Sequence, residues 1–192
     1  MSESPPPPSS QNAPDEALQA RLQQLRDEFP EALLEERLSE AEMDFTVAPA
    51  ALADFVDALR RLLLPPQHAF CDACGVERAE GIEAVYRLSL LMEPRRVTIR
   101  TLVPRNKALL PTLTHLYKGA LWAERELAEM FGVHFEEHPD LRHLLLPEDW
   151  QGYPLRKDYE VPRAHPYLAP DPLREAPERV LGAEAAAEDA NS

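Results

Sequence analysis

The chain has 192 residues, enough for about one domain, and its 34 acidic against 20 basic side chains give a formal net charge of −14. This balance disfavours nucleic-acid binding, which depends on Lys and Arg to neutralise phosphates. No apolar run approaches the ~18–20 residues of a membrane-spanning helix, and two cysteines are too few for a disulfide framework. We therefore expect a soluble acidic protein of a reducing cytoplasm.

Proline divides the chain into segments. There are 20 prolines, about twice the usual share of about 5%, and they concentrate towards the two ends. The ends also lack a regular hydrophobic period. We predict a disordered Pro-rich tail over 1–14, an α+β domain over 15–135, an extended partner-docking segment over 136–177 and a frayed polar tail over 178–192.

The hydrophobic pattern between the tails predicts three helices and three strands. Apolar residues spaced by three and four indicate helices, and alternating apolar and polar residues indicate strands. Pro30 stops the first helix, and Gly132 occupies the C′ position after the last one. In chain order the predicted elements are a helix over 15–29, a strand over 43–47, a helix over 49–63, strands over 82–90 and 97–103 joined as a hairpin through 93–96, and a helix over 116–131.

This order, α-β-α-β-β-α, has strands that lie too close in sequence for crossover connections. It predicts an α+β fold in which a small mixed or antiparallel sheet packs with helices and an extended C-terminal segment follows.

Two short motifs suggest chemistry but fit it poorly, and the six glycines form neither a dinucleotide-binding motif nor a P-loop. Cys71 and Cys74 form a C-x-x-C pair, but zinc and iron–sulfur sites need about four ligands. A redox dithiol, or two small buried side chains at a strand end, stay open for this pair. His134 to His138 spell H-x-x-E-H, a zinc-hydrolase string that needs both histidines on one helical face. A preceding helix-ending glycine and the following proline argue against a helix there.

The stretch 118–159 is the most informative part of the chain. Its predicted helix carries Glu124-Arg125-Glu126 and Glu129, a His138-Pro139-x-Leu141-Arg142 turn follows, and the run LPEDWQGYPLRKDY ends at Tyr159. This constellation resembles the 30 kDa subunit family of respiratory complex I, the C-type subunit of NADH-quinone oxidoreductase. The family signature is E-R-E, two residues, Asp or Glu, two hydrophobics, six residues, His or Lys, three residues and Arg. The residues that match the motif or extend it are Glu124, Arg125, Glu126, Glu129, His138, Arg142, Trp150, Arg156, Lys157, Asp158 and Tyr159.

Upstream, the likeness to this family is looser. It covers residues 70–76, the Leu110–Thr114 segment and Arg100, and Glu77 stands where the family usually has Asp.

The resemblance implies a subunit that binds no flavin, nucleotide, metal or iron–sulfur cluster itself, because FMN, the Fe-S clusters and quinone belong to partner subunits. It implies a peripheral-arm position on the cytoplasmic side of the bacterial inner membrane. The partners would be chiefly the D-type subunit, which shares the quinone site, and neighbouring Fe-S subunits, with membrane contact only through the complex. The subunit would support the quinone-reducing module of a proton-pumping NADH:quinone oxidoreductase without being catalytic alone.

The motif also has a physical interpretation. We expect Glu124, Arg125, Glu126 and Glu129 on the helix face opposite the Leu116–Phe131 stripe, with Arg125 and Glu129 spaced for an i,i+4 pair. Such a pair is worth only ~0.2–0.5 kcal/mol when exposed, so forked arginine–carboxylate bonds at a dry subunit interface are favoured. Further residues would supply partners or interface hot spots: Arg142, Arg156 and Lys157, and the aromatic Trp150 and Tyr159.

Several alternatives stay open. The acidic cluster is otherwise an ordinary solvated helix face, and Glu124 or Glu126 as a general acid–base lacks a partnered nucleophile or metal. The chain is otherwise a homologous subunit of a membrane-bound hydrogenase or related ion-pumping complex. In a different class, it is a stand-alone zinc hydrolase or dithiol redox enzyme.

Overall fold

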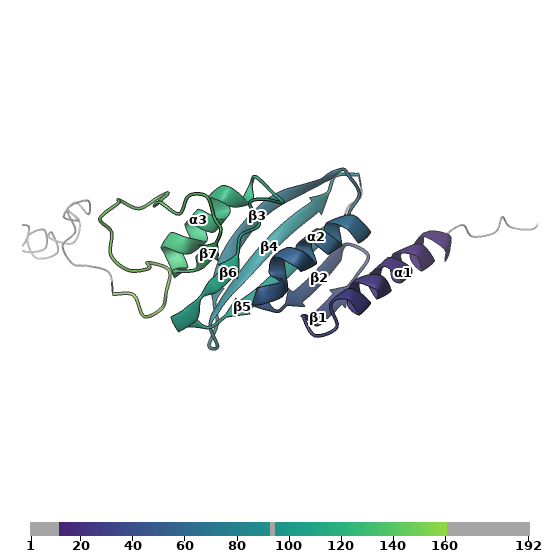
Figure 1. Ribbon diagram of the computed structural model, residues 1–192, viewed down its shortest axis with the longest axis horizontal. Coiled ribbons are helices and arrows are strands. Elements are labelled where there is room, and N and C mark those ends of the chain that lie inside the picture. The colour runs from purple at the N-terminus through teal and green to yellow at the C-terminus, as the bar shows by residue number, and fades with distance from the viewer. Residues whose placement is uncertain (1–11, 93–94, 161–192) are drawn as a thin grey trace, which may run out of the picture. The chain divides into compact units, whose positions relative to one another are not determined.

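The computed structural model describes residues 12–92 and 95–160, and the described residues through Tyr159 belong to one compact unit (Figure 1). The predicted tails over 1–11 and 178–192, the docking segment over 161–177 and two residues of the hairpin turn, 93–94, lie outside the described residues.

A five-stranded mixed sheet forms the centre of this unit. Its strand order is β1-β2-β5-β4-β3. β2 and β5 run parallel, and the other neighbours run antiparallel. The predicted α+β class with a small mixed sheet is therefore confirmed, although the crossover from β2 to β5 is a connection that the sequence argument did not expect. The strands span Leu33–Leu38 (β1), Glu42–Val47 (β2), His68–Glu77 (β3), Ile82–Leu90 (β4) and Arg96–Val103 (β5).

Three α-helices accompany the sheet in the described part of the chain. α1 (Asn12–Glu28) begins three residues before its predicted start, so residues 12–14 are its first turn and not part of the predicted disordered tail. α2 (Leu52–Leu62) follows a short 3₁₀ turn, η1 (Pro49–Ala51). α3 (Ala120–Phe131) begins four residues after its predicted start and ends at Gly132, whose φ of 70° is the left-handed conformation that glycine adopts without a Cβ penalty.

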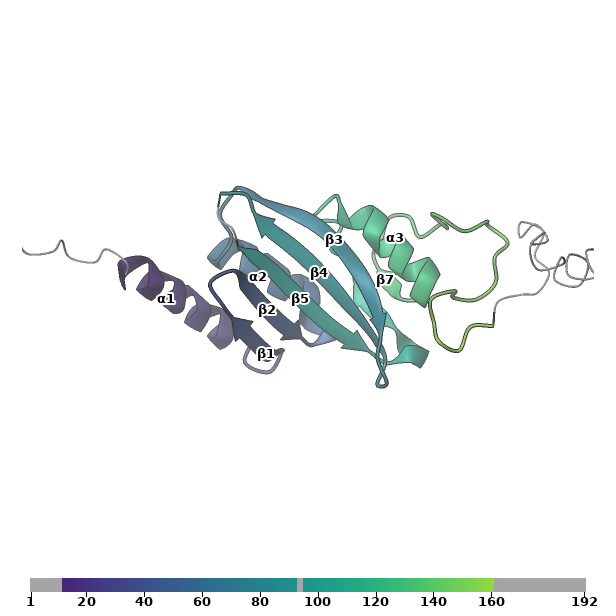
Figure 2. The same cartoon turned by 180° about the vertical axis from the view of Figure 1, so that it is seen from behind.

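α2 covers one face of the sheet and leaves the other free of helices over β2, β5 and β4 (Figures 1 and 2). On the covered face, Phe45 of β2 and Tyr86 of β4 are fully buried together with Phe55 and Leu59 of α2. The rings of Phe45 and Phe55 meet edge to face, with centroids 5.5 Å apart. Burying each such side chain contributes roughly 1.5–3 kcal/mol, so this layer holds the fold together.

α3 lies against β3, which is an edge strand of the sheet, and a glycine in this strand makes the close approach possible. A Cβ on Gly75 would lie 2.5 Å from the Phe131 ring and 2.8 Å from a Leu127 methyl carbon. Two short parallel strands, β6 (Leu109–Pro111) and β7 (His134–Glu136), flank α3 in sequence and pair with each other. They bring the segment before the helix next to the segment after it.

Four strands escaped prediction: β1, β3, β6 and β7. The sequence of β1, LLEERL, does not alternate cleanly, and β3 contains Cys, Asp and Gly residues with a bulge between Phe70 and Asp72. Among the helices of the described ranges, none combines the length and the apolar character needed to cross a membrane.

Candidate functional site

The motif on α3 points into the molecule. Glu124 is fully buried and Glu129 is 5% exposed, so the expectation that both lie opposite the apolar stripe is wrong. Glu124 comes four residues after Ala120 and three before Leu127, and this spacing puts it inside the stripe. Only Glu126 of the three glutamates is exposed.

The carboxylate of Glu129 holds the segment that follows α3. This segment, residues 137–160, has no helix or strand, and we call it the strap. Backbone N–H groups of Leu144 and Leu145 donate to Glu129 at 2.8 and 2.9 Å, and that of Leu146 donates at 3.4 Å. An irregular segment leaves its backbone donors without ladder partners, and this carboxylate supplies them.

Arg125 holds the strap one turn earlier in the helix. Its guanidinium donates to the carbonyl oxygens of Arg142 and His143 at 2.9 and 2.8 Å, with an Asp140 oxygen 3.7 Å away. Arg125 therefore binds strap carbonyls and does not form the i,i+4 pair with Glu129 that the helical spacing allows. Arginine takes strap carbonyls while the glutamate takes strap N–H groups, so the two side chains clamp consecutive strap residues by opposite polarity.

Glu124 binds the segment that leads into α3. The Thr112 hydroxyl lies 2.5 Å from its carboxylate, and the Leu113 backbone N–H donates to it at 2.8 Å. Burial raises the pKa of Glu124 to about 7, although these two hydrogen bonds favour the ionised form. The carboxylate also adds to the effect of burial in raising the pKa of Tyr86, a fully buried residue of β4.

His138 is a buried, neutral part of the same core. Its Nε2 lies 3.2 Å from the Leu121 carbonyl oxygen, and its Nδ1 accepts the Asp140 backbone N–H at 3.1 Å. Burial lowers its pKa, which favours the neutral ring. The Nε2 to Glu124 carboxylate distance is 3.9 Å, and both side chains are fully buried.

The basic residues do not pair with the α3 acids as expected. Arg142 is 81% exposed and pairs with Asp140 at 2.8 Å, and its guanidinium lowers the pKa of that carboxyl. Arg156 donates to the Phe131 carbonyl oxygen at 2.6 Å and stacks on the Tyr153 ring, 4.4 Å from its centroid. These contacts fix the strap to itself and to the end of α3.

Glu77 is a site residue that sequence reasoning missed. The Lys157 backbone N–H, rather than its ammonium group, donates to the Glu77 carboxylate at 2.5 Å, and Arg105 forms an ion pair with the same carboxylate. Glu77 ends β3, 80 residues before its partner, so no local spacing could have linked them. Its departure from the usual family residue was the available signal.

The remaining motif residues lie near the end of the strap. The rings of Trp150 and Tyr159 stack with centroids 6.5 Å apart, while Asp158 is exposed. Tyr159 also packs against Gly152, whose φ is 85°.

The two short motifs are not sites in this fold. Cys71 is exposed and Cys74 half-buried in β3, so the expectation of two buried residues at a strand end is wrong. Three strand residues span about 10 Å, more than the ~7 Å that a disulfide bridges. His134 lies in β7 and His138 in the strap, so they share no helical face. Within the described ranges no cluster of three metal-ligating side chains is found.

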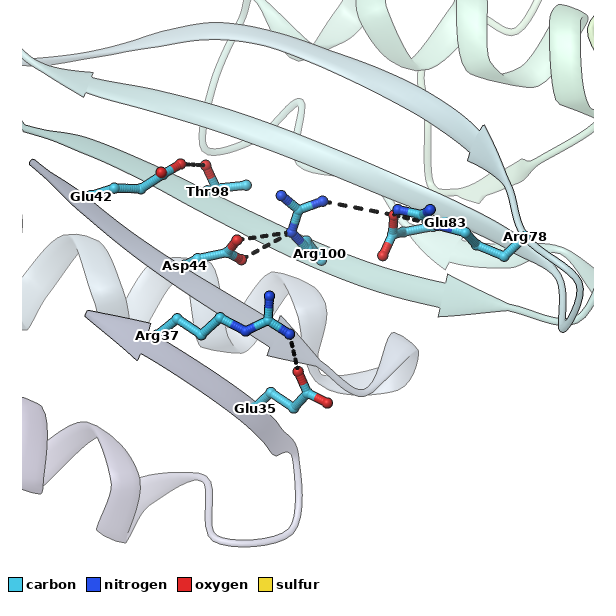
Figure 3. Close-up of polar contacts among 8 residues, drawn as sticks. All are labelled: Glu35, Arg37, Glu42, Asp44, Arg78, Glu83, Thr98 and Arg100. Atoms are coloured by element: carbon cyan, nitrogen blue, oxygen red, sulfur yellow. Dashed lines mark hydrogen bonds and ion pairs between the residues drawn. The ribbon is translucent and has the colours of Figure 1, made fainter. Parts of the chain in front are cut away.

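A second polar cluster lies on the helix-free face of the sheet (Figure 3). Both carboxylate oxygens of Asp44 lie 3.0 Å from Nε of Arg100, and Arg100 lies 3.7 Å from Glu83, which also binds Arg78 at 2.7 Å. These pairs cross β2, β5 and β4 with alternating charge, which is typical of the solvated face of a sheet. They reinforce strand register and leave the α3–strap unit as the candidate functional site.

Comparisons with known proteins identify the family. The family model of the 30 kDa subunit of the respiratory-chain NADH dehydrogenase matches residues 45–165. The chain belongs to this family. The matched residues begin in β2 and run past the end of the strap, so they take in four strands of the central sheet, α3 and the strap together.

Relatives in this family are subunits of quinone oxidoreductases. The C subunit of NADH-quinone oxidoreductase from Roseiflexus castenholzii is 35% identical over 140 residues, which cover 71% of this chain and 80% of the relative. The J subunit of NAD(P)H-quinone oxidoreductase from Prochlorococcus marinus is 49% identical over 97 residues, which cover 46% of this chain and 56% of the relative.

Solved structures share the fold. A chain of the membrane-bound sulfane sulfur reductase, an archaeal respiratory membrane complex, has a TM-score of 0.62 and 26% identity, covering 74% of this chain and 85% of its own. The trypsin-resistant fragment of Nqo5 has a TM-score of 0.50 and 23% identity, covering 65% of this chain and 99% of its own. At this identity the second likeness concerns the fold alone.

Proposed function

We propose that this chain is a peripheral-arm subunit of a proton-pumping NADH:quinone oxidoreductase, on the cytoplasmic side of a bacterial inner membrane. It carries no cofactor itself and supports the module that passes electrons from NADH, through FMN and Fe-S clusters in partner subunits, to quinone. Its principal neighbour is the D-type subunit, which shares the quinone site. Family membership carries this proposal.

The use of the motif side chains supports a structural role for the chain itself. Glu129 and Arg125 are occupied by strap backbone groups, and Glu124 by Thr112 and Leu113. A catalytic acid–base needs access to a reacting group, whereas these groups hold an irregular segment in one shape. The hydrogen bonds of the motif residues therefore hold the strap in a fixed shape in which its side chains can contact a partner.

The strap and the outer face of α3 offer apolar side chains for docking. Leu145 is 63% exposed, Leu155 55%, Tyr153 41% and Trp122 of α3 58%. Large exposed apolar side chains on a fixed backbone bind a partner at low entropic cost. We propose that the 136–177 segment docks on the D-type subunit through the strap side chains Leu145, Tyr153 and Leu155, with Trp122 of α3 and residues beyond 160 extending the contact.

Purification of the tagged full chain from its native membranes tests the assignment. The co-purifying subunits should include the NADH-binding flavoprotein and the D-type subunit, and loss of the chain should abolish NADH:quinone reductase activity. Recovery of the chain alone from membranes with undiminished activity would contradict the proposal.

A matched pair of variants tests the docking surface. Leu145→Ser in the strap should reduce recovery of the D-type subunit, while Leu91→Ser, equally exposed at 63% beyond the end of β4, should not. Equal recovery with both variants would remove the strap from the interface.

A second candidate keeps the structural role but changes the complex. This candidate is a subunit of a membrane-bound hydrogenase or related ion-pumping complex, and the observation that favours it is the 26% identity to a chain of an archaeal sulfane sulfur reductase. Co-purification of a nickel–iron large subunit in place of NADH-binding flavin partners would select this candidate.

A further inference from the structure

A chain of hydroxyl groups connects the buried Glu124 to a hollow at the surface. The Thr112 hydroxyl oxygen lies 2.5 Å from the Glu124 carboxylate and 2.9 Å from the Thr114 hydroxyl oxygen. Thr114 lines a hollow of about 530 Å³ at the start of α3. The other residues around this hollow are His115, Lys118, Leu121, Trp122, Glu137 and Pro139.

Glu124 is a carboxyl group whose described neighbours include no cationic side chain. The groups that interact with it are Thr112 and the Leu113 N–H from the segment after β6, the His138 ring from the strap, and the Tyr86 hydroxyl of β4, whose pKa the Glu124 charge raises. The bonds of His138 to Leu121 and Asp140 fit a neutral imidazole. Arg125, the next residue along the helix, points to the strap carbonyls instead.

The hydroxyl network satisfies both protonation states of the carboxyl group. When Glu124 is protonated, its O–H donates to Thr112 and the Thr112 O–H donates to Thr114. When Glu124 is ionised, Thr114 donates to Thr112 and Thr112 donates to the carboxylate. The Thr114 backbone N–H donates to the Thr112 oxygen at 3.1 Å in either state. In neither state is the carboxyl group or a hydroxyl of this network left without a hydrogen-bond partner, so neither state carries the penalty of an unsatisfied buried polar group.

We propose that Glu124 is a proton-binding site, and that its proton enters and leaves through the Thr112 and Thr114 hydroxyls by way of the surface hollow. For each proton taken up at Thr114 from water, the O–H bond of Thr114 passes its proton to Thr112, and that of Thr112 passes its proton to Glu124. Each hydroxyl ends with one hydrogen, and the carboxylate gains one. Release follows the same steps in reverse.

The proton-binding site is separate from the proposed subunit role. It depends on α3 and the segment 112–114 within this chain, so it is testable on the isolated protein whichever complex the chain joins. Burial supports the site, since it raises the pKa of Glu124 to about 7, and a group with that pKa changes charge around neutral pH.

Carbon-13 NMR of the glutamate carboxyl groups in the full chain tests the site. One carboxyl signal should titrate with a midpoint near pH 7, should vanish in Glu124→Gln and should persist in Glu126→Gln, the exposed control on the same helix. A wild-type midpoint below pH 5 for this signal, or protonation that persists above pH 9, would overturn the proposal.

Two threonine variants test the route. Thr112→Val removes a donor to the ionised carboxylate, so it should raise the midpoint, while Thr112→Ser should restore it. Thr114→Val does not touch the carboxylate, so the midpoint should stay in place while proton exchange slows, and two carboxyl signals should replace the single averaged one. Unchanged averaging in Thr114→Val, in a protein that folds as the wild type does, would show that the hydroxyl chain is not the path.

Discussion

Replacing Glu129 by alanine should release the strap from α3. The variant removes the acceptor for three strap N–H groups, of which those of Leu144 and Leu145 lie at 2.8 and 2.9 Å and that of Leu146 at a weaker 3.4 Å. A hydrogen bond to a charged group is worth about 1.5–3 kcal/mol, so the two short bonds together amount to about 3–6 kcal/mol. Water reaches the N–H groups of an opened, half-exposed strap and recovers part of this, which leaves an expected loss of about 2–4 kcal/mol.

Hydrogen exchange followed by mass spectrometry measures this loss where it occurs. Because about 1.4 kcal/mol corresponds to a tenfold change, protection of peptides from 138–158 should fall by roughly 30- to 700-fold. Peptides from β4 and β5 should change far less, because the layer between the sheet and α2 does not involve Glu129.

Two further variants sharpen the result. Glu126→Ala removes an exposed glutamate from the same helix and should leave strap protection within about twofold of wild type. Glu129→Gln keeps one acceptor oxygen and should fall between the wild type and the alanine variant. Strap protection in Glu129→Ala that matches Glu126→Ala would refute the clamp, since the same helix loses one carboxylate in both.

Two other changes have directions set by the geometry. Gly132→Ala puts a Cβ at φ 70° and 2.6 Å from both Arg156 and the Tyr153 ring. The strain should reduce the free energy of unfolding by about 2 kcal/mol or more and lower the melting temperature by about 4–8 °C. An unchanged melting temperature would contradict the close packing. The pKa of Glu124, raised from 4.5 to about 7 in the fold, means that the folded state binds this proton more tightly than the unfolded state. The contribution of Glu124 to the free energy of unfolding is therefore complete below pH 4.5, falls by about 3 kcal/mol between pH 4.5 and 7, and is flat above pH 7. The difference in the free energy of unfolding between wild type and Glu124→Gln, measured by urea denaturation, should show this pH dependence. A difference that stays constant from pH 4.5 to 7 would be inconsistent with it.

The sequence predicted those elements whose periods are clean. The hairpin of β4 and β5 alternates along almost its full length, and α2 carries an apolar stripe between proline signals. β1 and β3 were missed because they are the edge strands of the sheet. Edge strands are more exposed than central strands, so they tolerate polar residues that interrupt the apolar–polar alternation. The parallel pairing of β2 with β5 joins strands that are distant in sequence, so no local sequence pattern predicts it.

The sequence also identified the residues of the α3–strap unit but not their orientation. Their charge suggested that Glu124 and Glu129 face outward, and burial in an interface with a partner was then needed to explain why charged residues are grouped there. The helical spacing of Glu124 within the apolar stripe was the stronger signal, because a charged residue in a stripe is buried with hydrogen-bond partners. Contacts such as that of Glu77 with Lys157 join β3 to the strap across 80 residues, beyond the reach of spacing arguments.

The orientation of these side chains changes how the charge of −14 relates to assembly. Two of the acidic groups, Glu124 and Glu129, are already hydrogen-bonded inside the chain, so a partner is not required to supply their hydrogen bonds. An irregular segment of this length lacks the hydrogen-bond ladder that would hold a helix or strand. Side chains of α3 act in its place: Arg125 and Glu129 bind chiefly strap backbone atoms, and Arg125 also lies 3.7 Å from the Asp140 carboxylate. The strap side chains that point outward, such as Leu145 and Leu155, are thereby left for recognition, and their substitution should alter partner binding without loosening the strap.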